Sequence, residues 1–151
     1  FHYTIIGVSK KAEELIYAIN DNNLEEHVTL IPSLNQNDVY SIIQKSDLLI
    51  LPSLEEGIAN VCIEAMALGT TVISTNCGGM EELIIDNETG FLVPTRDPVA
   101  LANKIIEVKR MGSEKKNTIQ KKARLRVEEQ HNEAKMIADM ENLYRIVYEG
   151  H

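Results

Sequence analysis

Short apolar runs alternate with amphipathic stretches along most of the chain. The runs are rich in Val, Ile and Leu and end at or near turn residues, which is typical of strands. They lie at residues 2–8, 27–32, 47–53, 70–75 and 91–94. Strands that alternate with helices at short intervals predict an α/β fold, in which a parallel sheet is covered by helices on both faces.

The stretches between these runs have helical spacing and typical helix ends. Asn35 or Asn37 is suited to cap the second helix, and Gly69 to end the third. Asp97 followed by Pro98 is a typical helix start. Helices are expected within residues 12–19, 34–46, 59–68, 78–85 and 96–110, and at about 113–129 and 132–148.

The loops at the carboxyl ends of the strands are the expected ligand sites in such a fold. These loops follow Val8, Ile31, Leu51, Thr75 and Val93. In the loop after Leu51, Gly57 allows a ligand to approach the backbone closely. The helix that follows offers free first-turn amides, which bind anions such as pyrophosphate.

The helix after Gly57 contains a carboxylate that its composition does not explain. From Ile58 to Leu68 every residue is apolar except Asn60 and Glu64, so we expect a buried helix. A buried carboxylate without partners costs several kcal/mol. Glu64 lies one turn into this helix, about 6 Å along its axis. There it either accepts hydrogen bonds from ribose hydroxyls or caps the amides of a neighbouring loop.

A second glutamate, Glu56, precedes the helix by a few residues. Glu56 and Glu64 are eight residues apart, which would place them about 80° apart on a continuous helix. This separation suits different parts of one extended ligand better than a shared metal ion. The chain has no G-x-G-x-x-G loop, no P-loop and no G-x-S-x-G elbow. The sequence therefore lacks several common nucleotide-binding and hydrolase motifs.

Charge and cysteine content narrow the possible partners. The net charge of −8 argues against a general nucleic-acid binder. Nine of the fifteen Lys and Arg residues lie within 104–126, which fits solvated helix faces, with an anionic membrane surface as the alternative. Cys62 and Cys77 have no metal-ligand spacing with each other or with the histidines. We therefore expect reduced thiols and a cytoplasmic protein.

The segment "LPSLEEGIANVCIEAMALGTTVIST" resembles the E-x7-E motif of retaining glycosyltransferases of family 4, with Glu56 and Glu64 as its two glutamates. The continuation "NCGGMEELIIDNETGFLVPTRDPVALANKI" is similar to the glycine loop and the D-G-x-T-G and D-P segments of that family. The resemblance extends over nearly the whole chain. It implies the Rossmann-like, donor-binding C-terminal half of a two-domain GT-B architecture, with its first strand missing.

The resemblance also implies roles for individual residues. Glu64 binds the ribose of the donor, and Glu56 contacts the donor sugar near the reacting carbon. The backbone of Gly57, Ile58, Ala59 and Asn60 lies along the sugar and the phosphates. The remaining donor-binding residues are Gly7 at the first strand end, Ile31, Pro32 and Ser33 near the base, and the Gly78 and Gly79 turn.

The implied reaction transfers a sugar from a nucleoside diphosphate sugar with retention of configuration, without an essential metal or another cofactor. The acceptor, a sugar or a lipid-linked molecule, would bind through an N-terminal domain upstream of this chain. The Arg and Lys that neutralise the diphosphate would lie on a strand and loop just before the start of this chain. Residues 1–148 are expected to form one donor-binding domain, and 149–151 the remnant of an expression tag. We expect the cytoplasm, including the inner membrane surface, as the location.

Two other functions share this architecture. One is a sugar-nucleotide epimerase, against which the E-x7-E spacing argues. The other is a non-catalytic module that binds a nucleotide sugar, which would be favoured if the upstream Arg and Lys were also absent. Because the N-terminal half is missing, the isolated chain is expected to transfer no sugar.

Overall fold

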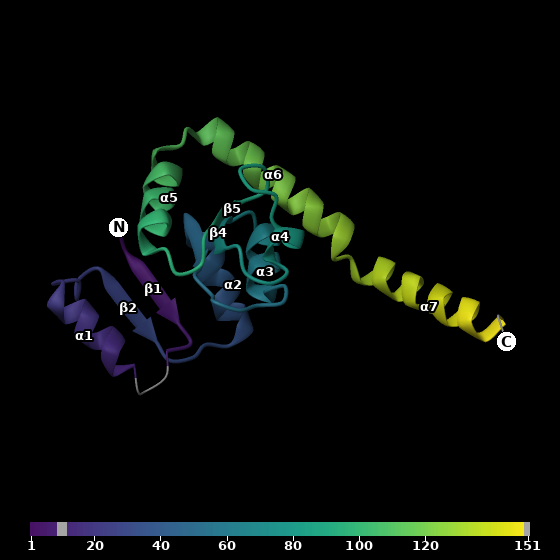
Figure 1. Cartoon of the computed structure of the whole chain (residues 1–151), viewed down its shortest axis with the longest axis horizontal. Coiled ribbons are helices and arrows are strands. Elements are labelled where there is room, and N and C mark those ends of the chain that lie inside the picture. Colours follow the sequence, from purple (N-terminus) through teal and green to yellow (C-terminus); the bar gives the residue numbers. More distant parts are fainter. Residues whose placement is uncertain (9–11, 150–151) are drawn as a thin grey trace. The chain divides into compact units, whose positions relative to one another are not determined.

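The structure, a computed structural model, describes residues 1–8 and 12–149. Its strands and helices alternate as the sequence predicts, and all strand pairs are parallel (Figure 1). The contacts divide the chain into two compact units, unit 1 at Phe1–Ser41 and unit 2 at Ile42–His151. The expected α/β fold with parallel strands and covering helices is confirmed. Apart from Glu149, the expected tag remnant lies outside the described residues.

Unit 1 is built around a two-stranded parallel ladder. β1 (Tyr3–Ile6) and β2 (Val28–Ile31) pair in register, and α1 (Glu13–Asp21) lies between them in the chain. The side chain of Asn35 accepts a hydrogen bond from the Asp38 amide at 3.0 Å. Of the two predicted caps, Asn35 is therefore the one that starts α2 (Gln36–Lys45).

Unit 2 contains a three-stranded parallel sheet in the order β3 (Leu48–Leu51), β4 (Thr71–Thr75) and β5 (Phe91–Val93). All five residues of the central strand β4 are buried. Successive side chains of a strand point to opposite faces. Both faces of β4 are therefore covered, as expected for a parallel sheet.

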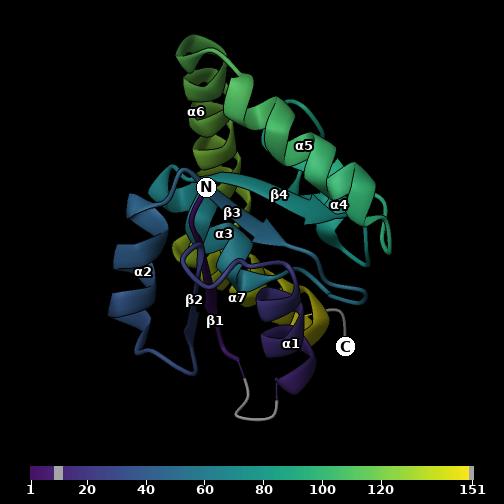
Figure 2. The same cartoon turned by 90° about the vertical axis from the view of Figure 1, so that its left-hand side faces the viewer.

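The helices of unit 2 follow the predicted ranges closely. They are α3 (Asn60–Leu68), α4 (Met80–Leu83), α5 (Pro98–Arg110), α6 (Ser113–Gln130) and α7 (Glu133–Glu149). Asp97 caps α5 by accepting a hydrogen bond from the Ala100 amide at 2.8 Å. The side chains of Val108 in α5 and Ile119 in α6 join the strand residues Ile73, Phe91 and Val93 in one core. Figure 2 shows α5 and α6 beside the strands that they cover.

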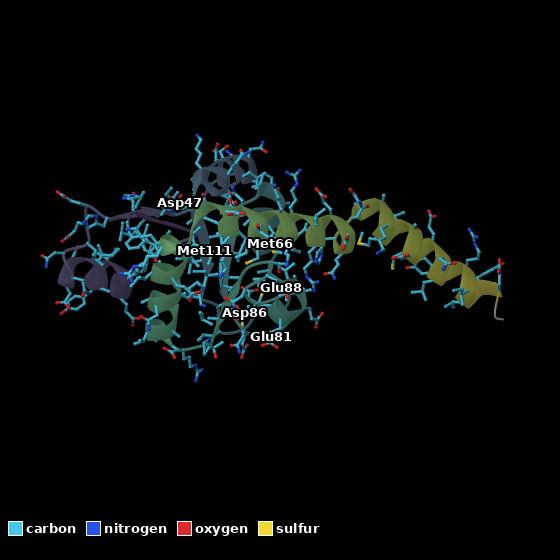
Figure 3. All side chains as sticks on the ribbon, turned by 90° about the horizontal axis from the view of Figure 1, so that it is seen from above. Asp47, Met66, Glu81, Asp86, Glu88 and Met111 are labelled. Carbon is cyan, nitrogen blue, oxygen red and sulfur yellow. The ribbon has the colours of Figure 1, made fainter. Side chains whose placement is uncertain are left out.

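The turn before β5 is held by its own polar groups. Asp86 accepts a hydrogen bond from the Leu92 amide at 2.9 Å, and Glu88 pairs with Lys122 of α6 at 3.0 Å (Figure 3). The hydroxyl of Thr89 accepts from the Ile85 amide at 2.9 Å. The segment 86–90 is thus a turn, as its composition predicts.

Helix α3 is less buried than its apolar sequence predicts. Cys62, Ala65 and Met66 are buried, whereas Glu64 and the other residues of the helix are partly or fully exposed. The expectation of a helix buried on every face was wrong, because α3 packs through one side against β4 and α6. Glu64 therefore remains in contact with solvent. Gly69 ends the helix at a φ of 82°, as predicted.

Helix α7 has no buried residue. Its apolar side chains are exposed, including Met140, Leu143 and Tyr144. Among the residues that the structure describes, no helix is both long and apolar enough to cross a membrane.

Candidate functional site

Two loops leave the same edge of the sheet in unit 2. Leu51 of β3 lies opposite Ser74 of the parallel strand β4, so the chain leaves both strands at one edge. We call residues 52–59 the Glu56 loop and residues 76–79 the Gly78 loop. The carboxyl edge of a parallel sheet is where ligands bind in open α/β folds. Both loops are therefore candidates for a binding site.

Side chains at the strand ends fix the Glu56 loop. The Ser53 hydroxyl donates a hydrogen bond to Oε1 of Glu56 at 3.0 Å. The Thr75 hydroxyl, at the end of β4, donates to the Ser53 carbonyl oxygen at 2.5 Å. The Cys77 sulfur lies 3.5 Å from the Thr75 oxygen. Because the single hydroxyl proton of Thr75 is used on Ser53, the Cys77 thiol is the donor in that contact.

The Gly78 loop packs backbone to backbone against the Glu56 loop. The Gly79 amide donates a hydrogen bond to the Gly57 carbonyl at 3.0 Å. A Cβ atom added to Gly78 would lie 1.6 Å from the carbonyl oxygen of Glu56. Gly78 also has a φ of +54°, which side chains rarely adopt. Only glycine fits this position, so the two loops have a fixed relative arrangement.

Helix α3 begins directly after the Glu56 loop without a side-chain cap. Its N-cap residue is Ala59, whose carbonyl accepts from the amides of Cys62 and Ile63. The amides of Asn60 and Val61 precede these first intrahelical bonds and can bind an anion. Gly57 precedes these two amides in the chain, and a Cβ added to it would have no atom within 4 Å. The space beside this backbone is open.

The structure places Glu64 in the second turn of α3, as predicted. It is partly exposed, and it already has an interaction partner within the chain. Both predicted roles of Glu64, binding of ribose hydroxyls and capping of a loop, stay predictions.

Cys62, in the first turn of α3, is fully buried. Burial raises the pKa of its thiol to about 12, and the charges of Glu56 and Cys77 contribute further. A thiol with so high a pKa stays protonated at neutral pH, so Cys62 is a packing residue. In the described part of the chain, no group of three or more His, Cys, Asp and Glu residues is placed to hold a metal ion.

The other predicted donor-binding residues lie in unit 1. The Gly7 amide donates to the Ile31 carbonyl at 3.0 Å, directly after β1 and at the end of β2. Gly7 has a φ of +90°, and Pro32 and Ser33 are exposed. The structure thus brings Gly7 to Ile31 at one strand edge.

Sequence reasoning missed Ser53 and Thr75. Ser53 had only its nearness in the chain as a signal, because it lies three residues before Glu56 in the same loop. Thr75 had none, since its partner is 22 residues away in the chain.

A parallel sheet with two interlocked loops and an uncapped helix at its carboxyl edge is the arrangement at which open α/β folds bind ligands. The family model "Glycosyl transferases group 1" matches residues 1–126. The chain belongs to this family, whose solved members have the GT-B fold.

Relatives from several bacteria support this assignment. The amylovoran biosynthesis glycosyltransferase AmsK of Erwinia amylovora is 39% identical over 108 residues, which cover 68% of this chain and 26% of AmsK. The capsular polysaccharide biosynthesis glycosyltransferase CapM of Staphylococcus aureus is 32% identical over 133 residues, or 82% of this chain and 34% of CapM.

A solved structure of Alr3699/HepE from Anabaena, in complex with UDP-glucose, matches with a TM-score of 0.75 and 25% identity. The match covers 85% of this chain and 35% of that one. This chain therefore matches between about a quarter and about a third of the length of these three proteins.

Proposed function

We propose that this chain is the donor-binding half of a retaining glycosyltransferase of family 4, which transfers a sugar from a nucleoside diphosphate sugar to an acceptor. The observation that carries the proposal is the placement of Glu56 and the uncapped start of α3 in one continuous segment at the carboxyl edge of the sheet. The likeness to a structure that contains UDP-glucose supports a nucleotide-sugar donor.

In this proposal the two glutamates of the E-x7-E motif act on different parts of the donor. Glu64 binds the ribose hydroxyls, and Glu56 accepts a hydrogen bond from the sugar near the reacting carbon. Residues 57–60 contact sugar and phosphate through their backbone, and the Gly78 loop lines the sugar. Gly7 and residues 31–33 contribute to the base side of the site.

The free amides of Asn60 and Val61 supply part of the chemistry. When the bond between sugar and diphosphate breaks, negative charge develops on the leaving group. Amides that are already oriented stabilise that charge without reorganisation, which lowers the barrier. Residues upstream of this chain would supply further cations, and an N-terminal domain would bind the acceptor, a sugar or a lipid-linked molecule. The names of the relatives support a role in polysaccharide biosynthesis, and we propose the cytoplasm, including the inner membrane surface, as its location.

Nucleotide binding tests the role of Glu64. The chain is titrated with UDP, GDP and ADP by calorimetry, and the preferred nucleotide is then titrated into the Glu64→Gln variant. Loss of a charge-assisted hydrogen bond costs about 1.5–3 kcal/mol, so affinity should fall more than about tenfold. Unchanged affinity together with a lower melting temperature would instead favour the capping role.

Turnover tests the role of Glu56 in a protein that also contains the N-terminal half. Glu56→Ala should lower kcat with an intact sugar nucleotide by about tenfold or more, because a contact made mainly in the transition state is worth about 2–4 kcal/mol. Binding of the bare diphosphate should change by less than about 0.5 kcal/mol. Equal weakening of bare diphosphate by Glu56→Ala and Glu64→Gln would contradict this division of labour.

Two further measurements test the reaction itself. The purified 151-residue chain should transfer no sugar, since the proposed acceptor site lies outside it. Robust transfer by the chain alone would contradict the proposed two-part organisation. Proton NMR of the product formed by the complete protein should show the anomeric configuration of the donor, and an inverted product would exclude the retaining mechanism.

A further inference from the structure

We infer that Ser53 is a positioning residue for Glu56, and that the end of β4 anchors Ser53 in turn. The inference rests on the proposed function of Glu56 and deepens it. It assigns a role to two residues, Ser53 and Thr75, for which the resemblance implies none.

The hydrogen bonds run in one direction from β4 to the carboxylate. Thr75 is 4% exposed, at the end of a fully buried strand, and its hydroxyl donates to the Ser53 carbonyl. The hydroxyl of Ser53 then donates to Oε1 of Glu56 at 3.0 Å. A hydroxyl that donates to a carboxylate forms one of the stronger hydrogen bonds in proteins. The buried strand thereby fixes the rotamer of a partly exposed side chain.

The backbone of Glu56 is fixed independently of its side chain. Its carbonyl oxygen occupies the space in which any residue at position 78 other than glycine would place Cβ. The neighbouring Gly57 carbonyl accepts the hydrogen bond of the Gly79 amide. With the main chain held by the Gly78 loop, the hydroxyl of Ser53 controls where the carboxylate points.

The geometry leaves one carboxylate oxygen for the donor sugar. Oε1 accepts from Ser53, and no described residue donates a hydrogen bond to Oε2. A carboxylate can accept several hydrogen bonds. The Ser53 contact therefore aims the second oxygen without occupying it. Removal of the hydroxyl should lower the rate of the chemical step and leave binding of the donor nearly unchanged.

The test uses the complete protein that contains this chain, with kcat and KM measured for the sugar nucleotide in three single variants. Ser53→Ala should lower kcat about tenfold, with KM and the affinity for bare diphosphate within about twofold of wild type. Ser53→Thr keeps the hydroxyl and should restore most of the rate. Ser46→Ala is the matched control. Ser46 lies just before β3, and its hydroxyl donates a hydrogen bond to the Ile42 carbonyl of α2, so this variant should leave kcat unchanged.

A double-mutant cycle with Glu56→Ala separates the possible outcomes. If Ser53 acts through Glu56, Ser53→Ala should cause no further loss of kcat in the Glu56→Ala background. An equal loss in both backgrounds, or wild-type kcat for Ser53→Ala while Glu56→Ala is impaired, would overturn the inference. Wild-type kcat for Glu56→Ala would instead refute the proposed function on which the inference rests.

Discussion

The two turns that flank β4 both contain a glycine with positive φ, yet the two glycines have different surroundings. Gly69, before the strand, has a φ of 82° and nothing within 4 Å of an added Cβ. Gly78, after the strand, has a φ of 54° and would place a Cβ 1.6 Å from the Glu56 carbonyl oxygen. The first glycine serves only the backbone, whereas the second also makes room for another loop.

The hydrogen bonds around the two turns show the same contrast. At the amino edge, the buried Thr70 hydroxyl donates to the Ile43 carbonyl at 2.8 Å and ties α2 to the start of β4. At the carboxyl edge, Thr75 donates to a loop residue, Ser53, that bonds in turn to the candidate catalytic Glu56. Similar threonine contacts thus stabilise the fold at one edge and shape the candidate site at the other.

The largest expected effect comes from Gly78→Ala. Positive φ costs a residue with Cβ about 1–2 kcal/mol, and crowding in a packed region adds about 1–3 kcal/mol. The free energy of unfolding should therefore fall by about 2–5 kcal/mol, as measured by urea denaturation. Gly69→Ala is the matched control, because it introduces the same strained φ into open space and should cost only the first of these amounts. Equal losses for both variants would show that Gly78 is not crowded by the Glu56 loop.

Gly57→Ala should affect binding more than stability. An added Cβ meets nothing within 4 Å, and φ is not in the positive range, so the free energy of unfolding should change by less than about 0.5 kcal/mol. If the donor phosphates lie against this backbone, the methyl group should weaken nucleoside diphosphate binding about tenfold in calorimetry. If the variant bound the nucleoside diphosphate with wild-type affinity, the donor phosphates would not lie against Gly57.

Gly79→Ala isolates crowding from backbone strain. Gly79 has an ordinary φ of −84°, but an added Cβ would lie 3.0 Å from both the Gly57 carbonyl oxygen and a side-chain carbon of Ile58. We expect a loss of about 1 kcal/mol in the free energy of unfolding, partly offset by the reduced entropy of the unfolded chain. A larger loss than that of Gly78→Ala would contradict the order of crowding in the two positions.

Much of the fold follows from local sequence. The Asp97–Pro98 pair predicts the start of α5, and Gly69 predicts the end of α3, because each satisfies a specific need of a helix end. The run 70–75, rich in the β-branched residues Thr, Val and Ile, predicts the strand β4. The same reasoning also located the Glu56 loop, since helix starts after parallel strands are general anion sites.

Features that depend on contacts between distant segments were not predictable. The double glycine at residues 78–79 fits a simple turn as well as close packing, and only the path of the Glu56 loop distinguishes them. The one-sided burial of α3 depends on where α6 packs, and the exposure of α7 on the absence of a packing partner among the described residues. Apolar content predicted burial on every face of α3, but burial requires a surface to pack against.

The expected effect that is smallest near neutral pH is a pH dependence that originates at Cys62, next to the Glu56 loop. Burial, followed by the charges of Glu56 and Cys77, raises the pKa of this thiol from 9.0 to about 12. Below pH 9 the thiol keeps its proton in both the folded and the unfolded state, and it contributes no pH dependence. Above pH 9 the unfolded chain loses that proton first, so the free energy of unfolding falls as the pH rises towards 12.

Urea denaturation of the wild type and of Cys62→Ala, at intervals between about pH 8 and pH 10.5, measures this contribution as a difference in slope of less than about 1.4 kcal/mol per pH unit. Glu56→Gln tests whether burial or charge dominates the pKa of Cys62 at the carboxyl edge of β4. The variant removes the second of the three causes of the raised pKa and leaves burial intact. We therefore expect this variant to keep most of the wild-type slope. If it abolished the slope, the charge of Glu56 rather than burial would dominate the pKa of Cys62. The carboxylate would then lie closer to the start of α3 than its bond to Ser53 places it.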